Sequence, residues 1–135
     1  MITAVDTSVL SDIFSNDPTF MAASLQALRQ SRIDGALIAC DIVWSEVRAL
    51  FTQSSEATVA MLRARIEFVP VSMEAAALAG EAWRSYRRAG GSRSRIVPDF
   101  LIGSHAALQA DRLLTRDRGF HRRYFPDLTI LDPSA

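Results

Sequence analysis

The alternation of short apolar runs with amphipathic helical segments is the feature that most constrains the fold of this chain. Apolar runs at residues 2–5, 36–39, 68–71, 113–115 and 128–131 have the length of buried β-strands. Segments with a helical spacing of apolar residues separate them, at residues 9–14, 17–30, 42–53, 57–65, 73–89 and 98–110, and residues 118–124 form a short helical or irregular stretch. This alternation favours an α/β fold with a parallel sheet of four to five strands and helices on both faces, a three-layer sandwich.

Length and composition are those of one compact domain spanning residues 1–135. No apolar run approaches the roughly 20 residues of a membrane span, and Asp6 interrupts any apolar region of a signal peptide. The single cysteine, Cys40, excludes a disulfide within the chain and fits a reducing compartment. We therefore expect a cytoplasmic protein that makes no contact with a membrane.

All basic residues of the chain are arginines, and they are unevenly distributed although the formal net charge is zero. Two clusters stand out, one in residues 84–95 and the other in residues 112–123. Arginine pairs bidentately with phosphate groups, which makes both clusters candidates for RNA or phosphate contacts. Two solvated helix faces are the alternative interpretation. The absence of lysine rules out any chemistry that requires one.

Acidic residues lie close to the ends of several predicted strands. Asp6 follows the first strand, and Asp117 follows the strand at residues 113–115. Glu46 lies in the helix that follows the second strand, and Asp99 opens the helix that leads to residues 113–115. Because parallel strands share one carboxyl edge, where open α/β sheets bind their ligands, we expect these four carboxylates to converge there.

Four carboxylates at close range repel one another strongly unless a cation lies between them. Mg²⁺ or Mn²⁺ prefers such oxygen ligands, and a site of this kind suits the hydrolysis of phosphodiester bonds. Thr7, Ser8 and Thr115 can hold metal-bound waters or orient the acids. Each acid also has a purely structural interpretation: Asp6 as a helix cap, Asp99 as a partner of the helix dipole, Asp117 as a turn residue and Glu46 as a partly exposed helix residue.

Four sequence motifs together resemble those of the PIN-domain ribonucleases, and within these the VapC toxins of bacterial toxin–antitoxin pairs. They are Val5-Asp6-Thr7-Ser8, Ser45-Glu46-Val47, the stretch Pro98-Asp99-Phe100-Leu101-Ile102-Gly103-Ser104-His105-Ala106, and the stretch Leu113-Leu114-Thr115-Arg116-Asp117-Arg118-Gly119-Phe120. The resemblance covers nearly the whole chain, and the motifs around Asp99 and Asp117 are its most specific part. It implies a parallel sheet flanked by helices and an acidic Mg²⁺ or Mn²⁺ site that cleaves RNA.

The resemblance also assigns roles to individual residues and implies partners. Asp6 and Asp99 become the strongest candidates for metal ligands, and Glu46 and Asp117 complete the catalytic site through water or a second ion. Thr115 occupies a place where the family often has a hydroxyl group near the acids. Arg93, Arg95 and Arg116 are candidates for RNA contacts. By resemblance, the partners are RNA as substrate, a small VapB-like antitoxin and a second copy of the chain in a homodimer.

The same residues also allow other interpretations. A PIN-like module that binds RNA or an antitoxin without cutting would lack one of the acids, and this chain has all four. A receiver domain needs a lysine near its acids, and a phosphatase of the haloacid-dehalogenase type needs an Asp at position 8, which is Ser8. A surface position is the more natural expectation for Asp12, and a packed or surface position for His105. For His121, RNA contact and a surface role are equally plausible.

Overall fold

Five parallel strands separated by helices make up the computed structural model of the chain, which describes residues 1–92 and 95–134. The strands are β1 (Ile2–Val5), β2 (Ala36–Ala39), β3 (Ile66–Phe68), β4 (Arg112–Leu114) and β5 (Thr129–Leu131). The helices are α1 (Thr7–Phe14), α2 (Met21–Asp34), α3 (Asp41–Arg48), α4 (Ser54–Arg63), α5 (Met73–Arg88), α6 (Val97–Gln109) and α7 (Arg118–Tyr124). The predicted α/β fold is confirmed, and the sheet has five strands. None of the helices in the described ranges is long and apolar enough to cross a membrane.

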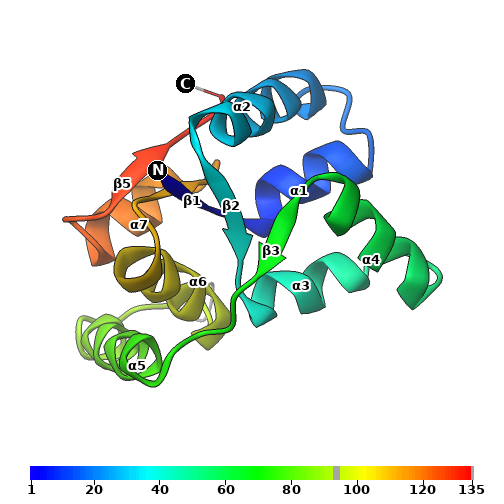
Figure 1. The fold of residues 1–135 in the computed structure, drawn as a ribbon. Helices are drawn as coiled ribbons and strands as arrows, with labels where there is room; N and C mark the ends of the chain where they lie inside the picture. Colours follow the sequence, from blue (N-terminus) through cyan, green and yellow to red (C-terminus); the bar gives the residue numbers. More distant parts are fainter. Residues whose placement is uncertain (93–94, 135) are drawn as a thin grey trace.

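The order of the strands determines where the sheet can build a site. The strands lie in the order β3-β2-β1-β4-β5, so the chain runs outward from β1 to β3 and then returns to β4 on the other side of β1. Figure 1 shows α1 to α4 on one side of the sheet and α5 to α7 on the other. The connections therefore diverge between β1 and β4, where Val5 pairs with Leu114. Such a divergence opens a crevice at the carboxyl ends of the two strands.

Two groups of buried apolar side chains support this arrangement. The larger one packs the central strands against the helices and includes Val5, Leu10, Val47 and Leu113, each at most 1% exposed. The second is aromatic and joins α5, α6 and α7, with Phe100 of α6 fully buried at its centre. The ring of Phe100 lies 5.0 Å from that of Phe120. This aromatic group fixes α7, and with it the loop that follows β4.

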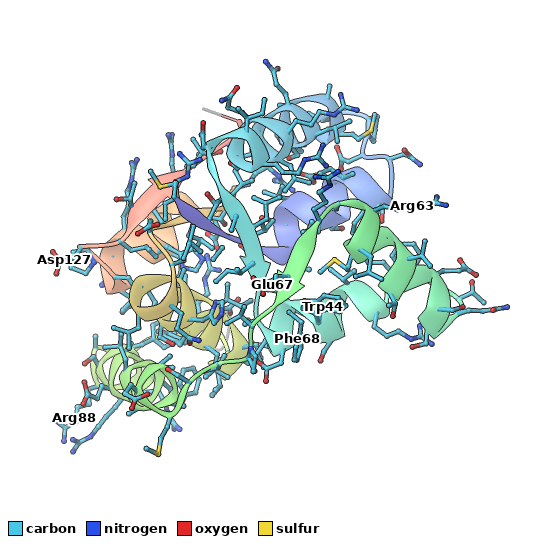
Figure 2. All side chains as sticks on the ribbon, viewed as in Figure 1. Trp44, Arg63, Glu67, Phe68, Arg88 and Asp127 are labelled. Atoms are coloured by element: carbon cyan, nitrogen blue, oxygen red, sulfur yellow. The ribbon has the colours of Figure 1, made fainter. Side chains whose placement is uncertain are left out.

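The third strand lies two residues earlier than its apolar run predicts. The run at residues 68–71 predicted the strand, whereas β3 spans Ile66–Phe68 and pairs Ile66 with Leu37. Pro70 has no N–H to donate to a sheet, which excludes the end of that run from a regular strand. Phe68 instead lies partly exposed at the end of β3, where its ring packs edge-on against that of Trp44 at 5.5 Å (Figure 2).

Candidate functional site

Asp6 lies at the divergence between β1 and β4, directly after β1, and is only 8% exposed. Its Oδ1 accepts a hydrogen bond from the backbone N–H of Thr7 at 2.7 Å, so Asp6 also caps helix α1. Its Oδ2 accepts a hydrogen bond from the Thr115 hydroxyl at 2.6 Å and a longer one from the Ser8 hydroxyl at 3.4 Å. Three donors therefore hold a largely buried carboxylate in one orientation.

The Thr115 hydroxyl connects Asp6 with a second acid. Thr115 is fully buried at the end of β4. Its Oγ1 donates to Asp6 and accepts a hydrogen bond from the backbone N–H of Asp117 at 2.9 Å. One hydroxyl group therefore fixes Asp6, the predicted ligand that directly follows β1, relative to the loop after β4.

Thr7 makes the corresponding connection to the third acid, because its Oγ1 donates to Glu46 Oε1 at 2.8 Å. Glu46 is exposed as a residue, but its carboxylate lies among the other acids at the first turns of α3. Burial of that carboxylate raises the pKa of Glu46, and the negative charges of Asp6 and Asp99 raise it further. Burial and two neighbouring negative charges thus favour the protonated form of Glu46, against the hydrogen bond from Thr7.

The raised pKa of Glu46 predicts a pH-dependent stability of the metal-free protein. A carboxyl group with a raised pKa in the folded state keeps its proton longer there than in the unfolded chain. Stability is therefore lost as the pH rises above the ordinary value of 4.5. Glu46→Gln should raise the free energy of unfolding in EDTA at about pH 7, and this gain should vanish near pH 4. Urea unfolding at both pH values measures it.

The matched control for this variant is Glu67→Gln, which removes an exposed carboxylate on β3 away from the cluster. It should change the stability much less at either pH. Destabilisation by Glu46→Gln at neutral pH would contradict the interpretation, because it would mean that the hydrogen bond from Thr7 outweighs the repulsion.

Asp99 and His121 complete the surroundings of the cluster. Asp99 lies in the first turn of α6, where its Oδ2 accepts a hydrogen bond from the Ile96 N–H at 3.1 Å. His121 of α7 is 2% exposed, and its Nε2 lies 4.0 Å from Asp6 Oδ2. Burial lowers the pKa of His121, opposed by the charges of Asp6, Asp117 and Asp99. His121 is therefore a buried neighbour of the acids and not the surface residue that one interpretation of the sequence expected.

Arg95 places a positive charge directly on this acidic cluster. Its guanidinium forms a bidentate ion pair with Asp117, with Nη2 donating to Oδ1 at 3.0 Å and Nη1 donating to Oδ2. Its Cζ also lies 4.5 Å above the ring of Phe120. Arg93, the other arginine predicted in this loop, lies outside the described residues.

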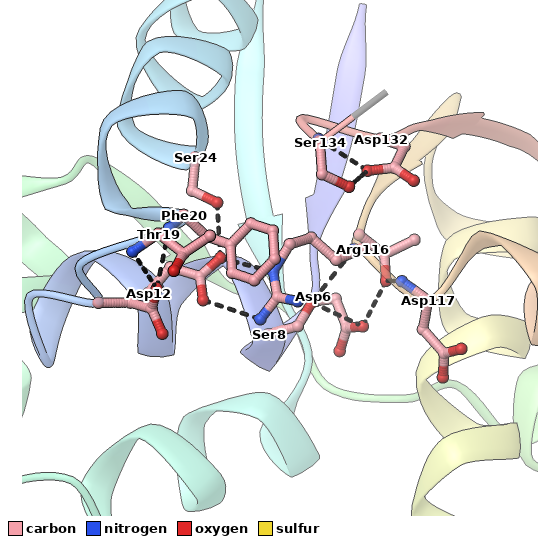
Figure 3. Close-up of polar contacts among 12 residues, drawn as sticks. Asp6, Ser8, Asp12, Thr19, Phe20, Ser24, Arg116, Asp117, Asp132 and Ser134 are labelled. Carbon is pink, nitrogen blue, oxygen red and sulfur yellow. Dashed lines mark hydrogen bonds and ion pairs between the residues drawn. The ribbon is translucent and has the colours of Figure 1, made fainter.

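Arg116 has a different environment from the one the sequence suggested. Its Nε and Nη2 donate to both carboxylate oxygens of Asp12 at 2.7 and 2.9 Å (Figure 3). Its Cζ lies 4.0 Å above the Phe20 ring. Asp12 is 3% exposed and also accepts a hydrogen bond from Ser24, so the expectation of a solvated Asp12 was wrong. His105 is packed, as predicted: it is 1% exposed and its Nε2 is hydrogen-bonded to the Val69 carbonyl at 2.8 Å.

The donor set of this site suits a hard divalent cation. Asp6, Glu46, Asp99 and Asp117 come from four separate segments, and their charges act on one another or on His121. Carboxylate oxygens are the ligands that Mg²⁺ and Mn²⁺ prefer, and a cation would relieve the repulsion that raises the pKa of Glu46. Within residues 1–92 and 95–134, no three acidic, histidine or cysteine side chains are already close enough to share an ion.

Sequence reasoning missed two contacts of this site, that of His121 with Asp6 and that of Arg95 with Asp117. His121 lies four residues after Asp117, and two helical residues at that spacing are neighbours, so this relation was a usable signal. The pairing of Arg95 with Asp117 joins residues on different segments, and neither spacing nor composition indicates it.

Comparisons with known proteins agree with the fold. The family model described as "PIN domain" matches residues 3–126. No curated protein matches the sequence. Among solved structures, the chain is similar to one in VapBC2 from Rickettsia felis bound to a DNA fragment from their promoter, with a TM-score of 0.75, 19% identity and 98% of each chain covered. VapBC-1 from nontypeable Haemophilus influenzae gives a TM-score of 0.72 at 18% identity, with 100% of each chain covered. FitAcB from Neisseria gonorrhoeae gives 0.69 at 20% identity, with 99% of each chain covered.

These structural similarities lie below 25% identity and concern the fold. The family match is independent of them and spans both motifs on which the resemblance most depends, those around Asp99 and Asp117. Since it covers residues 3–126 of 135, the chain belongs to the PIN domain family, whose members are generally nucleases.

Proposed function

We propose that this protein is a Mg²⁺- or Mn²⁺-dependent endoribonuclease that acts as the VapC-type toxin of a toxin–antitoxin pair. The observation that carries the proposal is the environment of Asp6. This carboxylate is nearly buried at the divergence of the sheet, is held by three donors, and has Glu46, Asp99 and Asp117 around it. Capping one helix does not require three further acids nearby, whereas a cation site does.

Asp6 and Asp99 would bind the metal directly, and Glu46 and Asp117 would complete the site through water or a second ion. The bound metal would lower the pKa of a water and stabilise negative charge on the phosphate that is attacked. Thr115 fixes the positions of Asp6 and Asp117 relative to each other through its two hydrogen bonds. Glu46, whose pKa is raised by burial and by its acidic neighbours, is suited to accept a proton from the attacking water.

Arg95 is the arginine that this arrangement favours as an RNA contact. Its guanidinium lies at the edge of the acidic cluster, on Asp117, and guanidinium groups bind phosphate bidentately. Arg93 precedes it in the same loop of the sequence and is proposed for the same role on sequence grounds alone. Arg116 pairs instead with Asp12, a nearly buried acid that is not one of the four, so we assign less of the RNA binding to it.

A small antitoxin is the proposed protein partner, in a cytoplasmic complex that keeps the enzyme inactive. The similar structures from R. felis and N. gonorrhoeae, VapBC2 and FitAcB, support such a partner. Helix α4 also exposes Val59 and Leu62 at 45% and 63%, and a protein partner would cover such apolar side chains. We propose a homodimer by resemblance alone. Co-expression with the neighbouring reading frame, followed by size-exclusion chromatography with light scattering, tests both assemblies.

Incubation of the purified protein with structured RNA tests the activity itself. We expect cleavage in Mn²⁺ or Mg²⁺ and none in EDTA, with activity restored when the metal is returned in excess. Cleavage that continues at full rate in EDTA would contradict the metal dependence. RNA binding without any cleavage at saturating metal would instead favour a non-catalytic PIN-like module.

A further inference from the structure

A groove of about 460 Å³ lies beside the acidic cluster, between the end of α5 and the start of α7. Its volume falls in the range of roughly 300–1,000 Å³ that is typical of small-ligand sites. Tyr86 and Phe120 form part of its lining and are each 7% exposed, while Tyr124 is partly exposed. Arg95 and Arg123 contribute positive charge. The groove thus combines aromatic surface with two guanidinium groups.

Glycines keep this groove open. Gly90, which has a φ of +78°, and Gly91 lie just after the end of α5. A Cβ at Gly91 would lie 2.6 Å from the Tyr86 ring, so a side chain there would displace the groove's lining. A Cβ at Gly119, on the other side, meets no atom within 4 Å. Glycine at such places lets a ligand approach the backbone closely.

Arg95 connects the groove with the acids, because it lines the groove and pairs with Asp117. The packing of α5 on α7 adds further charge, with the Tyr86 and Tyr124 rings 5.7 Å apart. It brings together the exposed arginines that end α5 and those of α7, which are Arg87, Arg88, Arg122 and Arg123. The two arginine clusters of the sequence thus meet at this groove through Arg95 and Arg123, in a chain whose net charge is zero. Such a patch attracts a phosphate backbone.

We propose that this groove binds one nucleotide of a single-stranded RNA next to the phosphodiester bond that the acids cut. The inference rests on the proposed function for the identity of the ligand, but the lining of the groove includes none of the four acids. Arg95 and Arg123 would hold the phosphate, and Tyr124 with the glycine backbone would contact the base. Aromatic side chains and arginine are the groups that bind unpaired nucleotides without reading their sequence.

Two glycines give a matched pair of variants to test this. Gly119→Phe fills the groove, and Gly80→Phe places the same side chain on an exposed position of α5, where a Cβ also meets no atom within 4 Å. Gly119→Ala controls for the loss of glycine alone. All are made in the Asp6→Asn background to prevent cleavage, and binding of a short fluorescent single-stranded RNA is measured by anisotropy.

We expect Gly119→Phe to weaken RNA binding by about 5-fold or more, since base stacking contributes about 1–3 kcal/mol. Gly80→Phe and Gly119→Ala should stay within about twofold of the background. Arg123→Gln, an exposed substitution that leaves the backbone unchanged, should weaken binding as well. It should also lower the slope of log K against log salt by about 0.7. This variant keeps the proposal testable if circular dichroism shows that Gly119→Phe is unfolded.

Unchanged RNA binding in folded Gly119→Phe, or in Arg123→Gln, would overturn the proposal. If these variants lose antitoxin binding but keep RNA binding, the proposal is overturned as well, because the groove would then bind a protein. Mn²⁺ binding distinguishes failure of this proposal from failure of the proposed function. The Gly119→Phe variant that keeps Asp6 should bind Mn²⁺ like the unmodified protein. A protein that binds RNA through the groove but binds no Mn²⁺ would retain this inference and lose the nuclease assignment.

Discussion

Asp6→Asn should lower the rate of RNA cleavage at saturating Mn²⁺ by at least about 100-fold, more than the 10–100-fold typical of losing a residue that only supports a metal ligand. The reason is that Asn removes the charge of the proposed metal ligand while keeping the shape of the side chain. The free energy of unfolding should change by less than about 1 kcal/mol, because the amide oxygen can still accept one of the three hydrogen bonds and the loss of a charge relieves Glu46.

The control for this variant is Asp127→Asn, which makes the same chemical change at an exposed acid far from the site (Figure 2). It should leave cleavage within about twofold of the wild-type rate. Cleavage is measured with a labelled RNA in the same preparation that is used for unfolding. Wild-type activity in a folded Asp6→Asn protein would show that the activity does not depend on this site.

Arg116→Met should destabilise the protein by about 3 kcal/mol, at the lower end of the 3–5 kcal/mol expected when one partner of a buried ion pair is removed. The loss leaves the Asp12 carboxylate, 3% exposed, with Ser24 at 2.7 Å as its remaining hydrogen-bond donor among the contacts described. The lower value follows from that hydrogen bond and from the 27% exposure of the Arg116 side chain. Urea unfolding at neutral pH measures the change.

Arg122→Met is the matched control, since Arg122 is exposed on α7, and it should cost less than about 0.5 kcal/mol. The double variant Asp12→Asn/Arg116→Met should recover part of the loss because no charge is left buried without its partner. If Arg116→Met leaves the stability unchanged and weakens RNA binding instead, the sequence-based expectation of an RNA contact describes this residue better than the ion pair does.

The positions of the acids could be predicted because they depend on local features. Asp6 directly follows β1, and Asp117 closely follows β4, so the edge that they share follows from the parallel topology alone. The third strand was misplaced because an apolar run does not reveal which of its residues can donate to a neighbouring strand. Pro70 cannot, and the pairing of Ile66 with Leu37 determines the register.

Buried polar side chains depended on partners far away in the sequence, and local patterns could not find them. Asp12 looks like a residue on the polar face of α1, yet Arg116, 104 positions later, allows it to be buried. His121 is buried because Gly103 of α6 has no side chain: a Cβ there would lie 2.2 Å from Phe125 Cε2 and 3.0 Å from His121 Nδ1. Gly103 lies within the helical pattern at residues 98–110, and its place there does not show which residue packs against it.

Calorimetric titration with Mn²⁺ tests whether Asp6, Glu46, Asp99 and Asp117 form a single divalent-metal site. If they do, we expect saturable binding to the wild-type protein, binding to Asp127→Asn at the same affinity, and a loss of at least about 100-fold in affinity in Asp6→Asn. Saturable binding that is equally tight in Asp6→Asn, or no binding to the folded wild-type protein, would contradict this expectation.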